Sequence, residues 1–149
     1  MIKITSIKDG IVIDHIRAGL GMKIYDLLDL KEISDEVAII LNAKSTRNGT
    51  KDILKVANNI KINLDAISII DPTATVNIIK DEKVVEKLVL ELPERAKGIL
   101  TCQNPKCIST SEREVESDFI LINKDEKTYK CAYCGHIYDV EEWYEKSFY

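Results

Sequence analysis

The sequence of 149 residues contains only two histidines, and no phosphate-binding glycine loop of the form GxxxxGK[ST] or GxGxxG. Two histidines leave few candidates for general acid–base chemistry, and no nucleophile–base–carboxylate set stands out. The missing glycine loops argue against nucleotide hydrolysis and against dinucleotide binding of the usual kind. We therefore expect a chain that binds a ligand without transforming it, and not an enzyme.

Long apolar runs are also missing, since the longest uncharged ones, such as residues 37–41, are far too short to cross a bilayer. Residues 1–5 have neither an apolar signal region nor a small-residue cleavage site, so we expect no secretory signal and no membrane partner. The expected location is cytoplasmic, where thiols stay reduced. The four cysteines are therefore first considered as metal ligands.

The net charge of −4 is unevenly distributed along the chain. Residues 1–97 carry fifteen basic and fifteen acidic side chains, whereas residues 98–149 carry six basic and ten acidic ones. Nucleic-acid binding depends on lysine and arginine neutralising phosphates. The acidic second half therefore argues against a nucleic-acid partner.

The first half alternates strand-like and helix-like segments. Strands are predicted at residues 10–16, 37–43, 51–57, 75–79 and 84–90, and helices around residues 20–28 and 64–69. The Asn48-Gly49 pair predicts a turn between the second and third strands. We therefore predict an α+β protein whose first domain has the ferredoxin-like β-α-β-β-α-β order.

A polar connector that contains Pro93 covers residues 92–97, and we place the domain boundary there, with domains at 1–95 and 98–149. Strand-like pieces follow at 99–101, 118–123, 127–130 and 137–139. A domain of about 50 residues is near the lower limit for a core unaided by a metal or disulfides. We predict a small β domain of the zinc-ribbon kind.

The cysteines form two close pairs, Cys102-x4-Cys107 and Cys131-x2-Cys134, with 24 residues from Cys107 to Cys131. This spacing is typical of a zinc site with four cysteine ligands. The alternatives are two disulfides or a redox Cys-x-x-Cys, and the latter has no need of the first pair. Four thiolates leave no open coordination position, so we predict one structural Zn²⁺. His136 is interpreted as an ordinary histidine rather than a ligand.

Several polar side chains of the first domain suggest an anion site. Asp14 and His15 interrupt an apolar strand, which is costly unless they have partners or face a site. Lys51 and Lys55 lie on one face of a predicted strand, and Lys87 lies on another strand that could converge on them. The alternative is a solvated outer face. Together the lysines suggest a pocket for the phosphates of a nucleotide.

Four stretches of the sequence resemble one known family in order and spacing. They are residues 10–16 (GIVIDHI), 49–55 (GTKDILK) and 72–77 (PTATVN), and the cysteine cluster followed by a hydrophobic tail. The family is the aspartate carbamoyltransferase regulatory chain, and the resemblance runs from about residue 4 to residue 140. Residues 92–95 (LPER) resemble its interdomain hinge.

The resemblance implies an allosteric nucleotide-binding domain and a zinc domain that contacts the catalytic chain. It also implies a regulatory homodimer, and CTP, ATP and UTP as effectors. The implied nucleotide-binding residues, with Ile53 added because it shares the lysine face, are Ile4, Thr5, Ser6, Ile7, Asp14, His15, Lys51, Ile53, Lys55, Asn77, Ile79, Val84 and Lys87. Arg17 departs from the family, which often has proline at that position.

Three other functions were considered. A zinc-ribbon nucleic-acid adaptor predicts a basic second domain, which this chain lacks. A ferredoxin-like module that regulates some other enzyme shares the first-domain pattern but does not explain the coincidence with this cysteine spacing. A stand-alone enzyme is disfavoured by the scarcity of acid–base groups. Co-purification with a catalytic trimer would separate these possibilities.

Overall fold

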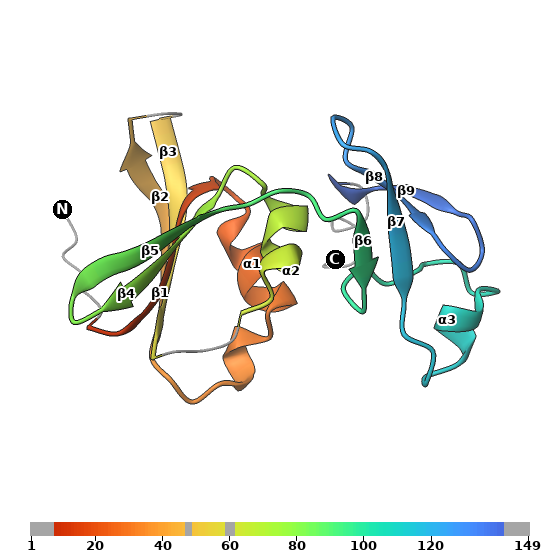
Figure 1. Ribbon diagram of the computed structural model, residues 1–149, viewed down its shortest axis with the longest axis horizontal. Helices are drawn as coiled ribbons and strands as arrows, with labels where there is room; N and C mark the ends of the chain where they lie inside the picture. The colour runs from red at the N-terminus through yellow and green to blue at the C-terminus, as the bar shows by residue number, and fades with distance from the viewer. Residues whose placement is uncertain (1–7, 47–48, 59–61, 142–149) are drawn as a thin grey trace. The chain divides into compact units, whose positions relative to one another are not determined.

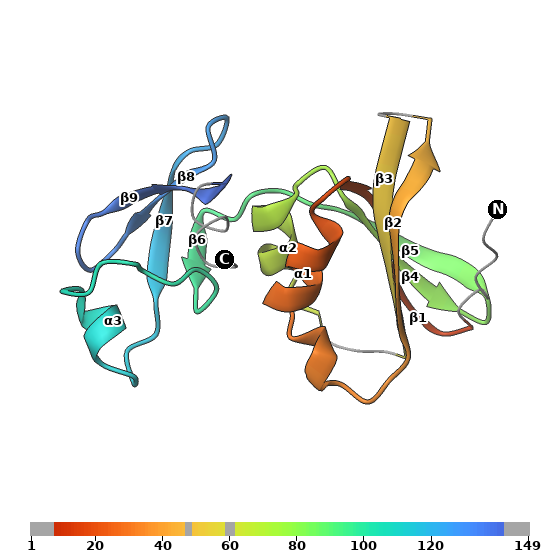
Figure 2. The same cartoon turned by 180° about the vertical axis from the view of Figure 1, so that it is seen from behind.

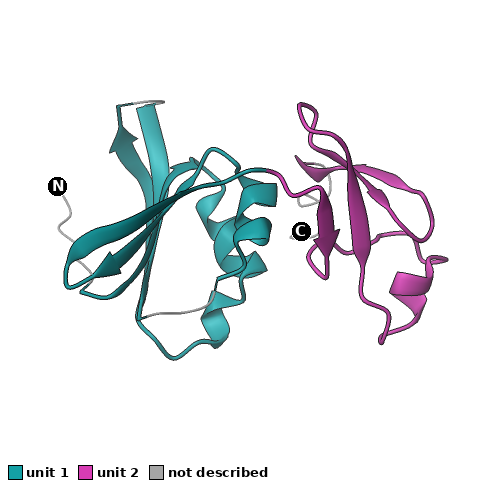
Figure 3. Cartoon of the chain, viewed as in Figure 1, with its two compact units in different colours: residues 1–91 teal, residues 92–149 magenta. Residues whose placement is uncertain are grey.

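The computed structural model describes residues 8–46, 49–58 and 62–141. The chain divides into two compact units, Met1–Glu91 (unit 1) and Leu92–Tyr149 (unit 2), which Figure 3 colours separately. The division falls at the start of the predicted connector, whose residues Arg95–Lys97 form a strand of unit 2. No helix in the described ranges has the length and apolar character needed to cross a membrane.

Unit 1 is built on a five-stranded antiparallel sheet with the order β2-β3-β1-β4-β5. Its elements are β1 (Gly10–Arg17), α1 (Gly21–Leu27), the 3-10 helix η1 (Leu30–Glu32), β2 (Val37–Ser45), β3 (Gly49–Ala57), α2 (Leu64–Ile70), β4 (Thr75–Lys80) and β5 (Lys83–Val89). Strands β1 and β2 both run antiparallel to β3, which separates them. This split β-α-β arrangement confirms the predicted ferredoxin-like order, and β5 extends the sheet at one edge.

Helices α1 and α2 cover one face of the sheet, as Figures 1 and 2 show from opposite sides. Alternate residues of each strand point toward the helices. Ile13 on β1, Leu54 on β3 and Val76 on β4 are almost fully buried there. They pack in the layer that also contains Ile24 of α1 and Ile67 of α2. The opposite face of the sheet carries the side chains that alternate with these residues, among them Val12, Lys55 and Asn77.

Both strands that neighbour β3 carry a bulge beside Asp52. The register of β1 shifts between Ile13 and Ile16, and that of β2 shifts between Ile40 and Ala43. The fully buried carboxylate of Asp52 accepts hydrogen bonds from the amides of Gly19, Gly21 and Asn42, each at 3.0 Å. A Cβ added to Gly21 would lie 2.9 Å from Asp52, so this approach requires glycine. Asp52 thus ties the start of α1 and the bulge of β2 to β3.

Unit 2 contains a four-stranded antiparallel sheet with the order β6-β7-β8-β9. Its elements are β6 (Arg95–Lys97), α3 (Ile108–Ser111), β7 (Asp118–Asn123), β8 (Thr128–Cys131) and β9 (Ile137–Asp139). The prediction of a strand at residues 99–101 is wrong. This segment has no strand structure, and the strand β6 lies before it. The other strands predicted in unit 2 agree with the structure to within one residue at each end.

The segment predicted as a connector, residues 92–97, is held in unit 2 by hydrogen bonds of its side chains and backbone. The Arg95 guanidinium donates two hydrogen bonds to the carboxylate of Asp118, and the Tyr129 hydroxyl donates to the carbonyl of Pro93 at 2.6 Å. The hydrogen bonds from Arg95 lower the pKa of Asp118 by more than burial raises it. Beneath these bonds, Phe119 and Tyr129 are fully buried. The core of unit 2 is thus small and centred on two aromatic rings.

Candidate functional site

The four cysteines are carried by two turns of unit 2. Cys102 and Cys107 flank a turn in which the Asn104 carbonyl accepts the Cys107 amide hydrogen bond at 3.0 Å. Cys131 ends β8, and its carbonyl accepts the amide hydrogen bond of Gly135 at 2.9 Å. Gly135 has a φ of 80°, the left-handed region that glycine adopts without strain. Each close cysteine pair therefore belongs to its own tight turn, as the spacing predicted.

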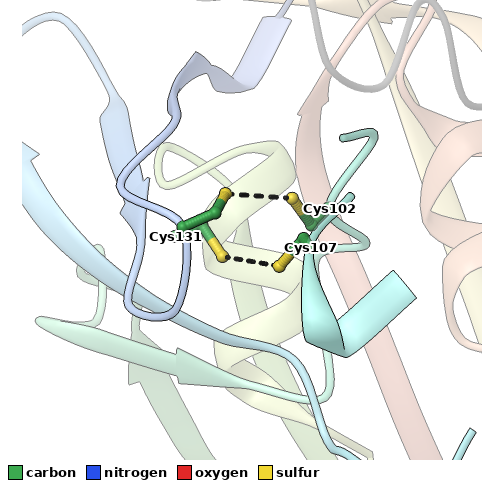
Figure 4. A group of neighbouring side chains, drawn as sticks. Cys102, Cys107 and Cys131 are labelled. Atoms are coloured by element: carbon green, nitrogen blue, oxygen red, sulfur yellow. Dashed lines mark hydrogen bonds between the residues drawn. The ribbon is translucent and has the colours of Figure 1, made fainter. Parts of the chain in front are cut away.

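The two turns bring all four sulfur atoms together within 4.8 Å of one another. The sulfurs of Cys102 and Cys134 are 3.7 Å apart, as are those of Cys107 and Cys131. A tetrahedron of sulfurs around zinc at about 2.3 Å has edges of about 3.8 Å. Figure 4 shows the sulfurs of the three labelled cysteines facing one another. All four cysteines are free, and they form a metal site whose geometry suits one structural zinc.

Burial and hydrogen bonding affect the four thiols differently. Burial raises the pKa of Cys102 and of Cys131 above the usual thiol value. A hydrogen bond with the Ser109 side chain lowers the pKa of Cys107. A cation that binds all four must therefore displace protons from buried thiols, which is the usual coupling of zinc binding to proton release. Bound zinc would then cross-link the two turns of a unit that has a small core.

His136 lies next to the site but does not join the sulfur cluster. The group of potential metal ligands found among the described residues consists of the four cysteines alone. The ring of His136 instead packs against that of Tyr138, with the centroids 4.5 Å apart. The carbonyl of His136 accepts the amide hydrogen bond of Cys131 at 2.9 Å. His136 thus contributes to the second turn through its backbone.

In unit 1, one cross-strand row lies on the sheet face opposite the helices and runs from Ala38 on β2, which pairs with Lys55, to Lys87 on β5. Val12 on β1 pairs with Lys55 on β3 and with Asn77 on β4, and Asn77 pairs with Lys87 on β5. Opposed residues of antiparallel strands project from the same face. The register therefore aligns two of the suggested lysines and the suggested asparagine, with an apolar valine between them.

Lys51 lies on the same face of β3 as Lys55, two repeats away, and its side chain contacts Asp14 of β1. The Lys51 ammonium is 3.0 Å from the Asp14 carboxylate, and both side chains are about one-fifth exposed. Partial burial acts to raise the pKa of Asp14, but the hydrogen bond and charge of Lys51 and the His15 amide together lower it. Nδ1 of His15 lies 3.1 Å from the Thr75 hydroxyl. His15 has a φ of 58°, which places it in the β1 bulge.

The other residues suggested as nucleotide ligands differ from one another in burial. Ile53 lies between the two lysines on β3 and is partly buried. Ile79 on β4 is buried, at 8% exposure, and pairs with Val84 on β5, which is 58% exposed. Residues 4–7, the suggested base and ribose segment, lie outside the described residues.

A cavity of about 140 Å³ opens beside Lys51 and includes side chains that the sequence patterns did not single out. Its lining combines His15, Ile16, Arg17, Ser45, Thr50, Lys51 and Thr73. The hydroxyl residues come from the β2–β3 hairpin and from the turn before β4. Arg17 and Ser45 lack any motif of their own, so only the pairing of β1 and β2 with β3 brings them together. Thr50 directly precedes Lys51, and this position next to a candidate lysine was a sequence signal that could have identified it.

Two family models match consecutive parts of the chain. The model described as aspartate carbamoyltransferase regulatory chain, allosteric domain, matches residues 2–91. The model described as aspartate carbamoyltransferase regulatory chain, metal binding domain, matches residues 94–144. The two matched regions correspond to unit 1 and to the unit that contains the four cysteines.

Curated relatives match over almost their whole length. The aspartate carbamoyltransferase regulatory chain of Clostridium tetani is 50% identical over 143 residues, which are 95% of this chain and 99% of the relative. That of Clostridium botulinum is 44% identical, with 93% and 94% of the two chains covered. That of Bifidobacterium longum is 37% identical, with 89% and 95% covered. The similarity is thus continuous across both units.

Proposed function

The chain belongs to the family of aspartate carbamoyltransferase regulatory chains, and we propose that it senses nucleoside triphosphates in unit 1 and docks on the catalytic chain through unit 2. It is a regulatory chain with an allosteric and a metal-binding domain, and not the catalytic chain of the enzyme. In this proposal CTP, ATP and UTP are the effectors. The assembly acts in the cytoplasm, and two copies of the chain pair as a homodimer.

The single observation that carries the nucleotide proposal is the cross-strand row. In this row Lys55 and Lys87 lie on either side of Val12 and Asn77. Ammonium groups on a rigid sheet suit phosphates, an amide suits a base edge or a hydroxyl, and an apolar side chain suits the face of a base. The nearby carboxylate of Asp14 forms its ion pair with Lys51 and not with either of these two lysines.

Alanine substitutions test the proposal directly. We expect Lys55→Ala and Lys87→Ala each to weaken ATP and CTP binding by about ten- to a hundredfold, because each loses a charge-assisted contact of about 1.5–3 kcal/mol. Isothermal titration calorimetry of the zinc-loaded chain measures the affinities. Lys31→Ala in η1, in the helical part of unit 1, is the matched control. Unchanged affinity in both row variants would place the nucleotide elsewhere.

The docking role is supported by the division of the chain. Unit 2 is a separate compact body that carries the metal site and exposes Ile108, Ile120, Ile122 and Ile137. Ile120 and Ile137 share one face of the sheet because both pair with Lys130, and exposed apolar patches mark protein interfaces. Allosteric coupling typically amounts to about 1–3 kcal/mol and requires contact with the regulated subunit.

Reconstitution with the purified catalytic trimer tests docking and regulation together. With zinc, we expect assembly and a shift of aspartate saturation on addition of nucleotide. After zinc removal we expect active catalytic trimers that no longer respond to nucleotide. Analytical ultracentrifugation reports assembly, and the same run on the regulatory chain alone reports the dimer. Assembly and nucleotide response that persisted without zinc would refute the docking role of unit 2.

A further inference from the structure

A tyrosine hydroxyl from β9 contacts one of the metal-site cysteines. The Tyr138 hydroxyl oxygen lies 3.5 Å from Sγ of Cys102 and 2.8 Å from the backbone nitrogen of Gln103. Cys102 and Tyr138 are 36 residues apart and are both buried. The contact therefore joins the first cysteine turn to the last strand of the sheet, independently of the metal.

The direction of these two hydrogen bonds follows from the groups involved. A backbone N–H can only donate, so the Gln103 amide donates to the hydroxyl oxygen and leaves the single hydroxyl proton free. A metal-bound thiolate has no proton and can only accept. The hydroxyl proton therefore points to Cys102, in a relay from the Gln103 amide through Tyr138 to the sulfur.

We propose that Tyr138 is a positioning residue of the metal site, whose hydroxyl orients the Cys102 thiolate and withdraws charge from it by hydrogen bonding. Four thiolates around Zn²⁺ carry a net charge of −2, and hydrogen bonds to the sulfurs disperse that charge in a buried site. Groups that hold metal ligands in this way commonly affect metal affinity by about 10- to 100-fold.

The hydroxyl is separable from the packing of the Tyr138 ring. The ring contacts Phe119, with centroids 5.8 Å apart, and His136, with centroids 4.5 Å apart. Phenylalanine at position 138 would keep both ring contacts and remove only the relay. A similar hydroxyl contact occurs at the second cysteine, where Oγ of Ser109 lies 3.1 Å from Sγ of Cys107.

The test is Tyr138→Phe in the full chain loaded with Co²⁺, which gives the tetrathiolate site an absorption spectrum. A hydrogen bond lowers the energy of the sulfur lone pairs, so its loss makes the sulfur-to-cobalt charge-transfer band easier to excite. We expect this band to move to longer wavelength. We also expect about tenfold weaker Zn²⁺ binding in competition with a chelator.

Tyr129→Phe is the matched control. Tyr129 is fully buried, pairs directly with Tyr138 across β8 and β9, and donates its hydroxyl proton to the Pro93 carbonyl rather than to sulfur. We expect Tyr129→Phe to lower thermal stability without moving the charge-transfer band. A band in Tyr138→Phe that coincides with that of the unaltered chain, or that moves equally in both variants, would overturn the proposal.

A measurement on the unaltered chain covers the case in which Tyr138→Phe does not fold. With ¹¹³Cd²⁺ in the site, a hydroxyl proton shared with a cadmium-bound sulfur shows a scalar coupling to cadmium across the hydrogen bond. We expect this coupling for the Tyr138 hydroxyl proton. A hydroxyl proton that is visible but uncoupled would overturn the proposal.

Discussion

Removal of the Asp52 carboxylate should destabilise unit 1 more than the loss of an ordinary surface charge. The carboxylate is fully buried, and it is the acceptor for the amides of Gly19, Gly21 and Asn42. In Asp52→Ala those three amides lose their acceptor at the same time. The change therefore affects both the entry to α1 and the bulge of β2.

The magnitude follows from the burial of each amide. The Gly21 hydrogen bond is buried, and an unsatisfied buried donor costs about 1–3 kcal/mol. The other two bonds are partly buried, so water can partly replace them and each costs about 0.5–1.5 kcal/mol. We expect a total loss of about 2–6 kcal/mol. Asp52→Asn keeps the shape and one acceptor oxygen, so it should lose about half as much.

Thermal and urea unfolding of the zinc-loaded chain measures this loss in the transition of unit 1. For a domain of this size each kcal/mol corresponds to about 4–8 °C in Tm, so Asp52→Ala should lower the midpoint by about 8 °C or more. Amide hydrogen exchange gives a local readout, because Gly21 and Asn42 should exchange faster. The control is Asp26→Ala, an exposed position of α1, which should change stability by less than about 0.5 kcal/mol.

One result would refute the reasoning. If Asp52→Ala differed from the unaltered chain by no more than Asp26→Ala does, and Gly21 kept its exchange protection, the amides would have other acceptors. The bulges of β1 and β2 would then be maintained by strand pairing alone.

Two further predictions concern metal removal and pH. Chelation should release one Zn²⁺ per chain and unfold unit 2 while unit 1 keeps its sheet, because structural zinc contributes about 10–16 kcal/mol in small peptides. Metal analysis and circular dichroism check this. A folded unit 2 without metal would contradict it. The Asp14–Lys51 pair should stabilise unit 1 by up to about 1 kcal/mol. Because the pKa of Asp14 is lowered from 3.8 on folding, this contribution is complete above the unfolded pKa and is lost as pH falls through the folded one. The stability difference between the unaltered chain and Asp14→Asn should therefore be constant from pH 5 to 7 and shrink below about 3.8; a difference that did not depend on pH would contradict this.

Features with a local signal were predictable from the sequence. The two cysteine pairs identify the metal ligands because a tight turn can present two sulfurs only at short spacing. Strand and helix periodicity in residues 10–90 determines which side chains face the helices, and from that the ferredoxin-like sheet followed. The polar face of β3, with Lys51 and Lys55, is visible in the same alternation.

Features that depend on register or on distant contacts were decided only by the tertiary structure. The register of the strand pairs sets which residues stand opposite one another, so no sequence pattern could align Lys55 with Asn77 and Lys87. Asp52 itself gave no signal, because an aspartate is buried only where backbone amides converge on it. Strand β6 (Arg95–Lys97) was missed because its residues follow Pro93 in a polar stretch that was interpreted as a connector, and two of the three are charged.

The contact between Tyr138 and Cys102 belongs to the same class. Position 138 alternates like any strand residue, and its hydroxyl reaches a sulfur only because the β8–β9 pairing and the first cysteine turn bring the two together. Sequence by itself thus determined the identity of the metal ligands and the layers of the first unit, since both depend on near neighbours along the chain. The ion pair at Asp14, the acceptor role of Asp52 and the hydrogen bonds around the sulfurs depend on residues that are close only in the folded chain.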